Sequence, residues 1–128
     1  MKYLLDTCAF LWLALEPDRL SASVIRIIND PASRLFLSDV SVWEIVLKHA
    51  VGKLPLPEPP DAWLPQQISH WQLETIPIAQ SAIYRSGTLP KAHHDPFDRL
   101  IAASAMESGL SLLSPDAPLS YLGAARIW

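Results

Sequence analysis

Four acidic residues far apart in the chain have the side-chain type and the spacing for metal-assisted chemistry: Asp6, Glu44, Asp98 and Asp116. Two carboxylates about 4 Å apart repel each other by about 4 kcal/mol at an effective dielectric constant of about 20. A fold that gathers four of them needs a cation, and oxygen ligands favour Mg²⁺ or Mn²⁺. These acids therefore predict a divalent-metal site that cleaves phosphodiester bonds.

Two of the acids follow apolar segments that we interpret as buried strands. Asp6 ends the run Tyr3-Leu4-Leu5, and Asp116 lies just beyond a strand expected over 110–113. In parallel α/β sheets, ligands bind beyond the carboxyl ends of the strands. Both carboxylates are therefore expected at that edge.

Glu44 lies in a helix expected over 41–51, directly after a strand expected over 34–38. Because the helix leaves that strand at its carboxyl end, Glu44 enters the same edge. The pattern Ser41-x-x-Glu44 matches a capping box at the start of the helix. Ser41, Glu44 and Lys48 form a narrow polar stripe on this otherwise apolar helix.

Asp98 opens a helix that leads into the strand at 110–113 and must run antiparallel to it. Asp95 is the expected N-cap, Pro96 the first helical residue and Gly109 the residue that ends the helix. The start of this helix, with Asp98, is therefore also expected at the carboxyl edge.

The other segments alternate in the same way. We expect helices over 9–15, 21–29, 61–71 and 79–86, strands over 73–78 and 125–128, and loops over 53–60 and 87–94. This alternation predicts an α/β fold with helices on both faces of a central parallel sheet of about four to five strands. Residues 1–128 are expected to form a single domain.

Each acid also has an ordinary structural explanation. Asp6 and Asp116 could start turns, and Asp98 would be favourable near a helix N-terminus without any metal. Glu44 could complete the capping box or pair with Lys48 one turn later. The metal-site hypothesis therefore depends on the coincidence of all four acids.

The composition narrows the class of protein. The chain has 128 residues, 50% of them hydrophobic, and a net charge of −3, so it lacks the basic character of a general nucleic-acid binder. Its single cysteine, Cys8, excludes an internal disulfide framework. No segment approaches the about 20 apolar residues of a membrane span. We expect a soluble cytoplasmic protein with a partner or a self-interface.

The order and spacing of four motifs resemble those of PIN-domain proteins. The motifs are Leu4-Leu5-Asp6-Thr7 with Leu11-Trp12-Leu13, Ser41-Val42-Trp43-Glu44-Ile45 through Gly52-Lys53-Leu54, His94-Asp95-Pro96-Phe97-Asp98-Arg99-Leu100-Ile101-Ala102, and Leu113-Ser114-Pro115-Asp116. The chain is most similar to VapC-type toxins of bacterial toxin–antitoxin pairs, which are small Mg²⁺-dependent ribonucleases. The resemblance implies a three-layer α/β/α PIN-like fold and an endoribonuclease that hydrolyses RNA.

The resemblance also assigns roles to the residues. Asp6, Glu44, Asp98 and Asp116 would form the acidic catalytic site, with Asp6 and Asp98 as the main ligands of Mg²⁺, or of Mn²⁺ in its place. The residues that would contact these carboxylates without binding the metal are Thr7, Ser114 and Asp95. Asp95 is also the alternative to Asp98 as a metal ligand.

Basic residues near the third motif are candidates for guiding the RNA substrate: Arg85, Lys91, His93, His94 and Arg99. The resemblance further implies a homodimer and an antitoxin whose tail covers an apolar groove. Trp43, Val46 and Leu47 on the helix at 41–51, and the segment around Trp12, are candidate surfaces for that tail.

Two other classes of protein compete with the nuclease. A phosphotransfer domain would use Asp6 as the acceptor, but Asp6-Thr7-Cys8 lacks the second Asp that a phosphatase-type motif has two residues later. A non-catalytic PIN scaffold would only bind RNA or a partner. The intact set of four acids argues against that scaffold, because a binding module has no need for mutually repelling carboxylates.

Overall fold

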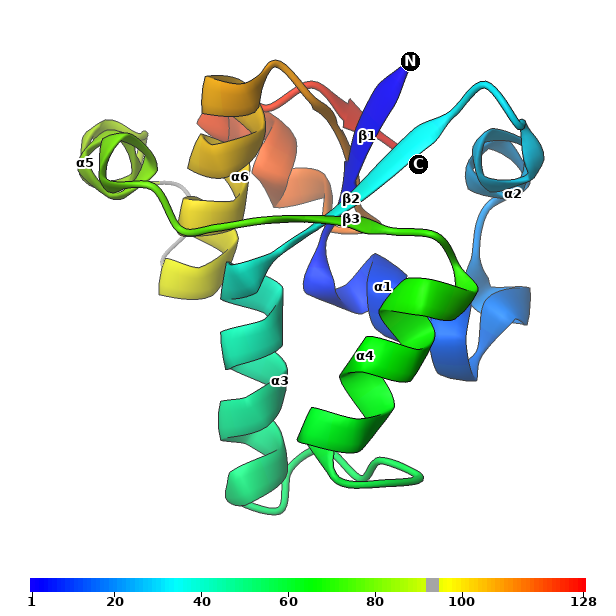
Figure 1. Ribbon diagram of the computed structural model, residues 1–128. Helices are drawn as coiled ribbons and strands as arrows, with labels where there is room; N and C mark the ends of the chain where they lie inside the picture. Colours follow the sequence, from blue (N-terminus) through cyan, green and yellow to red (C-terminus); the bar gives the residue numbers. More distant parts are fainter. Residues whose placement is uncertain (92–94) are drawn as a thin grey trace.

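A parallel sheet forms the centre of the protein, whose computed structural model describes residues 1–91 and 95–128 (Figure 1). Within those residues the sheet has five strands, all parallel to their neighbours. Their order across the sheet is β3 (Glu74–Ile76), β2 (Arg34–Ser38), β1 (Lys2–Leu5), β4 (Ser111–Leu113) and β5 (Arg126–Ile127). The predicted α/β fold with about four to five parallel strands is confirmed.

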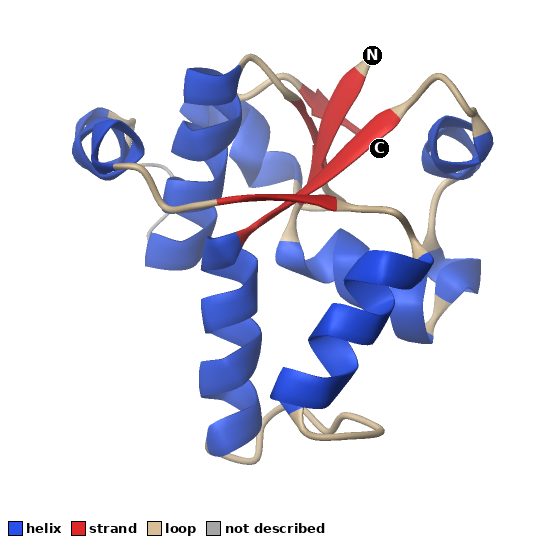
Figure 2. Cartoon of the chain, in the orientation of Figure 1, coloured by secondary structure: helices blue, strands red, loops and turns tan. Residues whose placement is uncertain are grey.

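Helices cover both faces of the sheet (Figure 2). One face packs against α1 (Thr7–Leu15), α2 (Ala22–Asn29) and α4 (Pro60–His70), and the other against α5 (Gln80–Thr88) and α6 (Pro96–Ser108). Helix α3 (Asp39–Ala50) continues beyond the carboxyl end of β2, past the edge of the sheet (Figure 1). Two 3₁₀ segments, Pro17–Arg19 and Ala117–Leu122, complete the elements and were not predicted.

The alternation of side chains along the central strand divides the core into two halves. In β1, Tyr3 and Leu5 point to the face covered by α1 and α4, whereas Leu4 points to the face covered by α6. Successive side chains of a strand point to opposite faces, so a strand buried on both faces is apolar throughout. This requirement explains why the strand segments read as continuous hydrophobic runs.

The capping box predicted at Ser41 is wrong. The helix begins two residues earlier, because Ser38 at the end of β2 is the N-cap and its hydroxyl accepts a hydrogen bond from the Val40 amide at 3.0 Å. Ser41 therefore lies inside α3, where it is fully buried. Glu44 is consequently in the second turn and is not the reciprocal partner of a cap.

Both predicted ends of helix α6 are confirmed. Asp95 caps α6 by accepting hydrogen bonds from the amides of Phe97 and Asp98, and Gly109 ends the helix with a left-handed φ of 65°. The loop predicted over 87–94 begins too early, because α5 continues to Thr88. The rest of that prediction, with His93 and His94, lies partly outside the described residues.

None of the helices in the described part of the chain has the length and the apolar character required to cross a membrane.

Candidate active site

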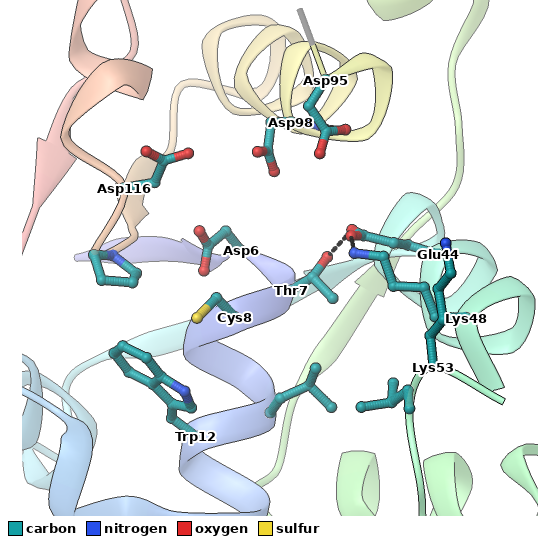
Figure 3. Close-up of a pocket in the computed structure, with 13 residues that line it drawn as sticks. Asp6, Thr7, Cys8, Trp12, Glu44, Lys48, Lys53, Asp95, Asp98 and Asp116 are labelled. Atoms are coloured by element: carbon teal, nitrogen blue, oxygen red, sulfur yellow. Dashed lines mark hydrogen bonds and ion pairs between the residues drawn. The ribbon is translucent and has the colours of Figure 1, made fainter. Parts of the chain in front are cut away.

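A pocket of about 480 Å³ opens at the carboxyl edge of the sheet, and all four predicted acids line it (Figure 3). They come from the end of β1, from α3, from the start of α6 and from the segment after β4. Its lining among the described residues is Asp6, Thr7, Cys8, Leu11, Trp12, Glu44, Lys48, Lys53, Leu54, Asp95, Asp98, Pro115 and Asp116. The convergence expected from the topology is therefore present in the structure.

Asp6 is held by a hydrogen bond to each of its carboxylate oxygens. Its Oδ1 accepts a hydrogen bond from the Ala9 amide at 2.7 Å, which makes it the N-cap of α1, and its Oδ2 accepts one from the Ser114 hydroxyl. The side chain is only 3% exposed. Because an ionised carboxyl offers about four acceptor sites, these two bonds fix its orientation while leaving acceptor capacity.

Ser114 joins two of the acids. Its hydroxyl donates to Asp6 and accepts from the Asp116 amide at 3.0 Å, and its side chain is fully buried after β4. The Asp6 amide in turn donates to the Leu113 carbonyl at 3.0 Å. These contacts hold the ends of β1 and β4, and with them Asp6 and Asp116, in a fixed relation.

Glu44 is bound by two donors of different kinds. Its Oε1 accepts from the Thr7 hydroxyl at 2.6 Å, and its Oε2 forms an ion pair with the Lys48 ammonium (Figure 3). Thr7 Oγ1 is also hydrogen-bonded to Ser41 Oγ at 2.9 Å. The polar stripe predicted on this helix is confirmed, and it attaches α3 to the start of α1.

Asp98 and Asp95 face the pocket from the first turn of α6 (Figure 3). This turn packs against α3, where the rings of Phe97 and Trp43 meet edge to face at 5.0 Å. Residues 101–105 of α6 are buried and, except for Ser104, apolar. Packing of a buried helix thus brings its charged start to the carboxylates of the other elements.

Burial raises the pKa of Asp6 to about 6. The hydrogen bonds from Ser114 and the Ala9 amide act in the opposite direction, while the charges of Asp116 and Glu44 raise the pKa further. A carboxylate in this environment lacks water and faces like charges, so a cation beside it would relieve both penalties.

Burial and the charge of Asp6 raise the pKa of the Cys8 thiol to about 11, so without a bound metal ion the thiol is protonated at neutral pH. The carboxylate and hydroxyl oxygens on the described lining of the pocket suit Mg²⁺ or Mn²⁺ better than zinc. These described residues therefore fit the predicted kind of metal.

The acids share a pocket without forming a finished metal cage. Among the described residues, no three Asp, Glu, His or Cys side chains are already grouped so that they could hold a metal ion. Glu44 in particular is turned toward Thr7 and Lys48. Coordination of an ion by three carboxylates would therefore require side-chain adjustment.

The basic residues predicted to guide RNA are not part of the described pocket lining. Arg85 pairs with Glu107 at 3.2 Å on the surface, and Lys91 is exposed. Arg99 donates to the backbone carbonyls of Ser86, Leu89 and Pro90 at 2.7–2.8 Å, which ties the end of α5 to α6. Their contact with RNA remains a prediction.

Two lysines that we had not singled out as substrate contacts do line the pocket. Lys48 follows Glu44 by one helical turn, and Lys53 comes directly after Gly52, whose positive φ of 77° turns the chain at the end of α3. The spacing from Glu44 to Lys48 was visible in the sequence. It indicated only an ordinary helical ion pair until both partners were found at the pocket.

Comparison with known proteins identifies relatives over nearly the whole chain. The family model for the PIN domain matches residues 3–123. Ribonuclease VapC22 of Mycobacterium tuberculosis is 32% identical over 114 residues, which cover 88% of this chain and 85% of that protein.

Solved structures show the same fold. DNA-bound VapBC from Salmonella typhimurium matches with a TM-score of 0.75 at 21% identity, over 100% of this chain and 97% of that chain. VapBC2 from Rickettsia felis, bound to a DNA fragment from its promoter, matches with a TM-score of 0.74 at 18% identity, over 99% and 98%.

The raised pKa of Asp6 predicts a specific pH dependence of stability. The unfolded value is 3.8 and the folded value about 6, so the parent should lose stability as the pH rises from about 4 through 6 when no divalent ion is present. Asp6→Asn removes the charge; its amide oxygen can still accept from the Ala9 amide, and its NH2 group can donate to the Ser114 oxygen once that hydroxyl has turned. The variant should become more stable than the parent by up to about 3 kcal/mol at pH 8, and the advantage should vanish at pH 4.

Urea denaturation in the presence of a chelator at both pH values measures this difference. Asp61→Asn, at an exposed position on α4, controls for the amide substitution itself. If the parent is as stable as Asp6→Asn at pH 8, or more stable, burial of the ionised Asp6 carboxylate does not destabilise the fold and the prediction is wrong.

Proposed function

This chain belongs to the PIN-domain family, in its VapC branch, and from that premise we propose that it is an Mg²⁺-dependent endoribonuclease toxin of a toxin–antitoxin pair. The VapC22 relative is named as a ribonuclease and shares most of its length with this chain. The observation that carries the proposal is the pocket at the carboxyl edge of the sheet, where Asp6, Glu44, Asp98 and Asp116 come together. Mn²⁺ is the expected substitute for Mg²⁺.

A bound divalent ion would polarise a phosphate oxygen of RNA and lower the pKa of a water molecule for in-line attack. In our proposal Asp6 and Asp98 are the main ligands, because they approach the pocket from a strand end and from a helix start. Ser114 and the Ala9 amide orient Asp6, so that its free acceptor positions face the pocket. Asp116 and Glu44 complete the negative site, and Thr7 and Asp95 support it through their contacts with Glu44 and with the start of α6.

The partner that we propose is an antitoxin protein that covers an apolar surface of α3. Trp43, Val46 and Leu47 are 50%, 40% and 42% exposed. Val46 also lines an apolar hollow of about 440 Å³ between α3 and α4, together with Val42, Leu64 and Ile68. Exposed apolar surface of this kind marks protein interaction sites, and the Salmonella typhimurium and Rickettsia felis structures are VapBC complexes.

Two further features of the proposal follow from the family. We propose that the protein works as a homodimer, and that it acts on RNA in the cytoplasm. A non-catalytic PIN scaffold that only binds RNA or a partner is the alternative. The same cleavage experiment separates it from the nuclease.

The first test is cleavage of RNA. The purified protein should cut single-stranded RNA with Mg²⁺ or Mn²⁺ and stop when a chelator is added. Asp6→Asn and Asp98→Asn should each lower the rate by at least about 100-fold, because both remove a ligand charge where the reaction needs it. Gel analysis of the products and growth of bacteria that express each variant measure the two effects.

Asp61→Asn serves as the matched control and should cut RNA as the parent does, because this exposed residue lies on α4 away from the acidic pocket. A parent that binds RNA but never cuts it would favour the non-catalytic scaffold. Full toxicity of Asp6→Asn would overturn the assignment of the site.

The second test is stabilisation by the ion itself. At a Mg²⁺ concentration about tenfold above the dissociation constant, mass action adds about 1.4 kcal/mol to the free energy of unfolding, which corresponds to a rise of about 4–6 °C in Tm. Asp98→Ala should erase this rise, and Asp61→Ala should keep it. An equal rise in the parent and in Asp98→Ala would place the ion elsewhere.

A further inference from the structure

Lys48 lies where an anionic substrate would meet the acidic pocket. Its ammonium pairs with Glu44, whose side chain is 5% exposed, but the lysine side chain itself is 46% exposed. Burial lowers the pKa of Lys48, but the hydrogen bond and charge of Glu44, with the charges of Asp95 and Asp98, outweigh it and raise the pKa. Lys48 therefore stays charged, with one side toward buried Glu44 and the other toward solvent.

Lys53 lies on the same wall of the pocket. The turn at Gly52 directs the chain back on itself, and the Lys53 amide donates to the Lys48 carbonyl at 2.9 Å. His49 Nδ1 lies 2.9 Å from the Leu54 carbonyl and fastens the same turn. Figure 3 shows both lysines on the Glu44 side of the pocket, away from Asp116.

The two oxygens of Glu44 are both engaged, by Thr7 and by Lys48. A carboxylate that is buried and held in this way is well placed to orient a lysine. Binding an ion directly would require Glu44 to break one of these contacts. The geometry thus separates Glu44 from the carboxylates on the other walls of the pocket.

We propose that Lys48 and Lys53 bind a backbone phosphate of single-stranded RNA beside the phosphate that is cut, and that Glu44 acts as the positioning residue for Lys48. The assignment rests on the proposed ribonuclease function. It goes beyond the acidic site because it names the cationic contact that lets a chain of net charge −3 hold an anionic polymer. Among the described residues, these are the two lysines on the lining of the pocket.

The chemistry fits a phosphodiester better than a compact anion. The pocket is bounded on one side by the carboxylates and on another by Leu11, Trp12 and Leu54. A free phosphate would meet the repulsion of the acids at full strength. A nucleic-acid strand can place one phosphate at the lysines, another at the ion and its bases along the apolar wall.

The salt dependence of RNA binding tests the assignment. We would measure the affinity for a short fluorescent single-stranded RNA of mixed sequence over a NaCl series, in the Asp98→Asn background with Mg²⁺ present. The logarithm of the association constant falls linearly with the logarithm of the salt concentration, and each lost phosphate contact reduces the magnitude of this negative slope by about 0.7 for a single strand. Because both lysines contact the same phosphate, Lys48→Met with Lys53→Met should reduce the magnitude of the slope by about 0.7, and Lys48→Met alone by a part of that amount.

Two variants control this measurement. Lys2→Met makes the same change of charge on exposed Lys2, at the start of β1 and the opposite edge of the sheet, and should leave the slope unchanged. Lys48→Arg keeps the charge and should restore most of the slope. This rescue separates a phosphate contact from a mere effect of Lys48→Met on folding, which the melting temperature reports.

The role of Glu44 is tested by a double-mutant cycle. If Glu44 acts through Lys48, Glu44→Gln should raise KM and lower the salt slope, and adding Lys48→Met should cause little further change. If the effects of Glu44→Gln and Lys48→Met on KM are additive, and Glu44→Gln leaves the salt slope unchanged, the positioning role of Glu44 is wrong.

The outcomes distinguish this assignment from the proposed function. A parent that cuts RNA while Lys48→Met keeps the parent slope overturns the lysine assignment alone. A parent that neither binds nor cuts RNA overturns the ribonuclease function and this assignment with it.

Discussion

Burial of the Asp6 carboxylate at the end of the central strand is the constraint on which the rest of the site depends. Removing this group from water is unfavourable, and the charges of Asp116 and Glu44 make it more so. The Ala9 amide and the Ser114 hydroxyl compensate only partly, since the pKa stays raised to about 6. A cation beside this group would offset both unfavourable contributions.

The architecture produces this situation from ordinary elements. Because β1 lies at the centre of a parallel sheet, its carboxyl end is covered on both faces and its last side chain has little access to water. The neighbouring strands β2 and β4 deliver α3 and the Ser114 segment to the same edge, and α6 returns its N-terminus there. The packing of apolar helices and strands thus sets the positions of the charged groups.

Sequence patterns predicted the parts that follow from local rules and strand polarity. The strands, the Asp95 cap and the approach of all four acids to one pocket were predictable in this way. The cap of α3 at Ser38 was missed, because Ser38 also fits the end of a strand and Ser41-x-x-Glu44 offered a competing pattern. The pairing of Glu44 with Lys48 follows from helical spacing within α3, but the hydrogen bond from Thr7 to Glu44 joins α1 to α3, and no local pattern encodes it.

The central claim is that the carboxylates gather around a divalent ion, and anomalous scattering from crystals grown with Mn²⁺ tests it most directly. The account predicts a manganese peak in the pocket, within coordination distance of the Asp6 and Asp98 oxygens, that disappears in Asp98→Ala crystals. A manganese peak bound elsewhere, or a pocket that stays without one at saturating Mn²⁺, would contradict it.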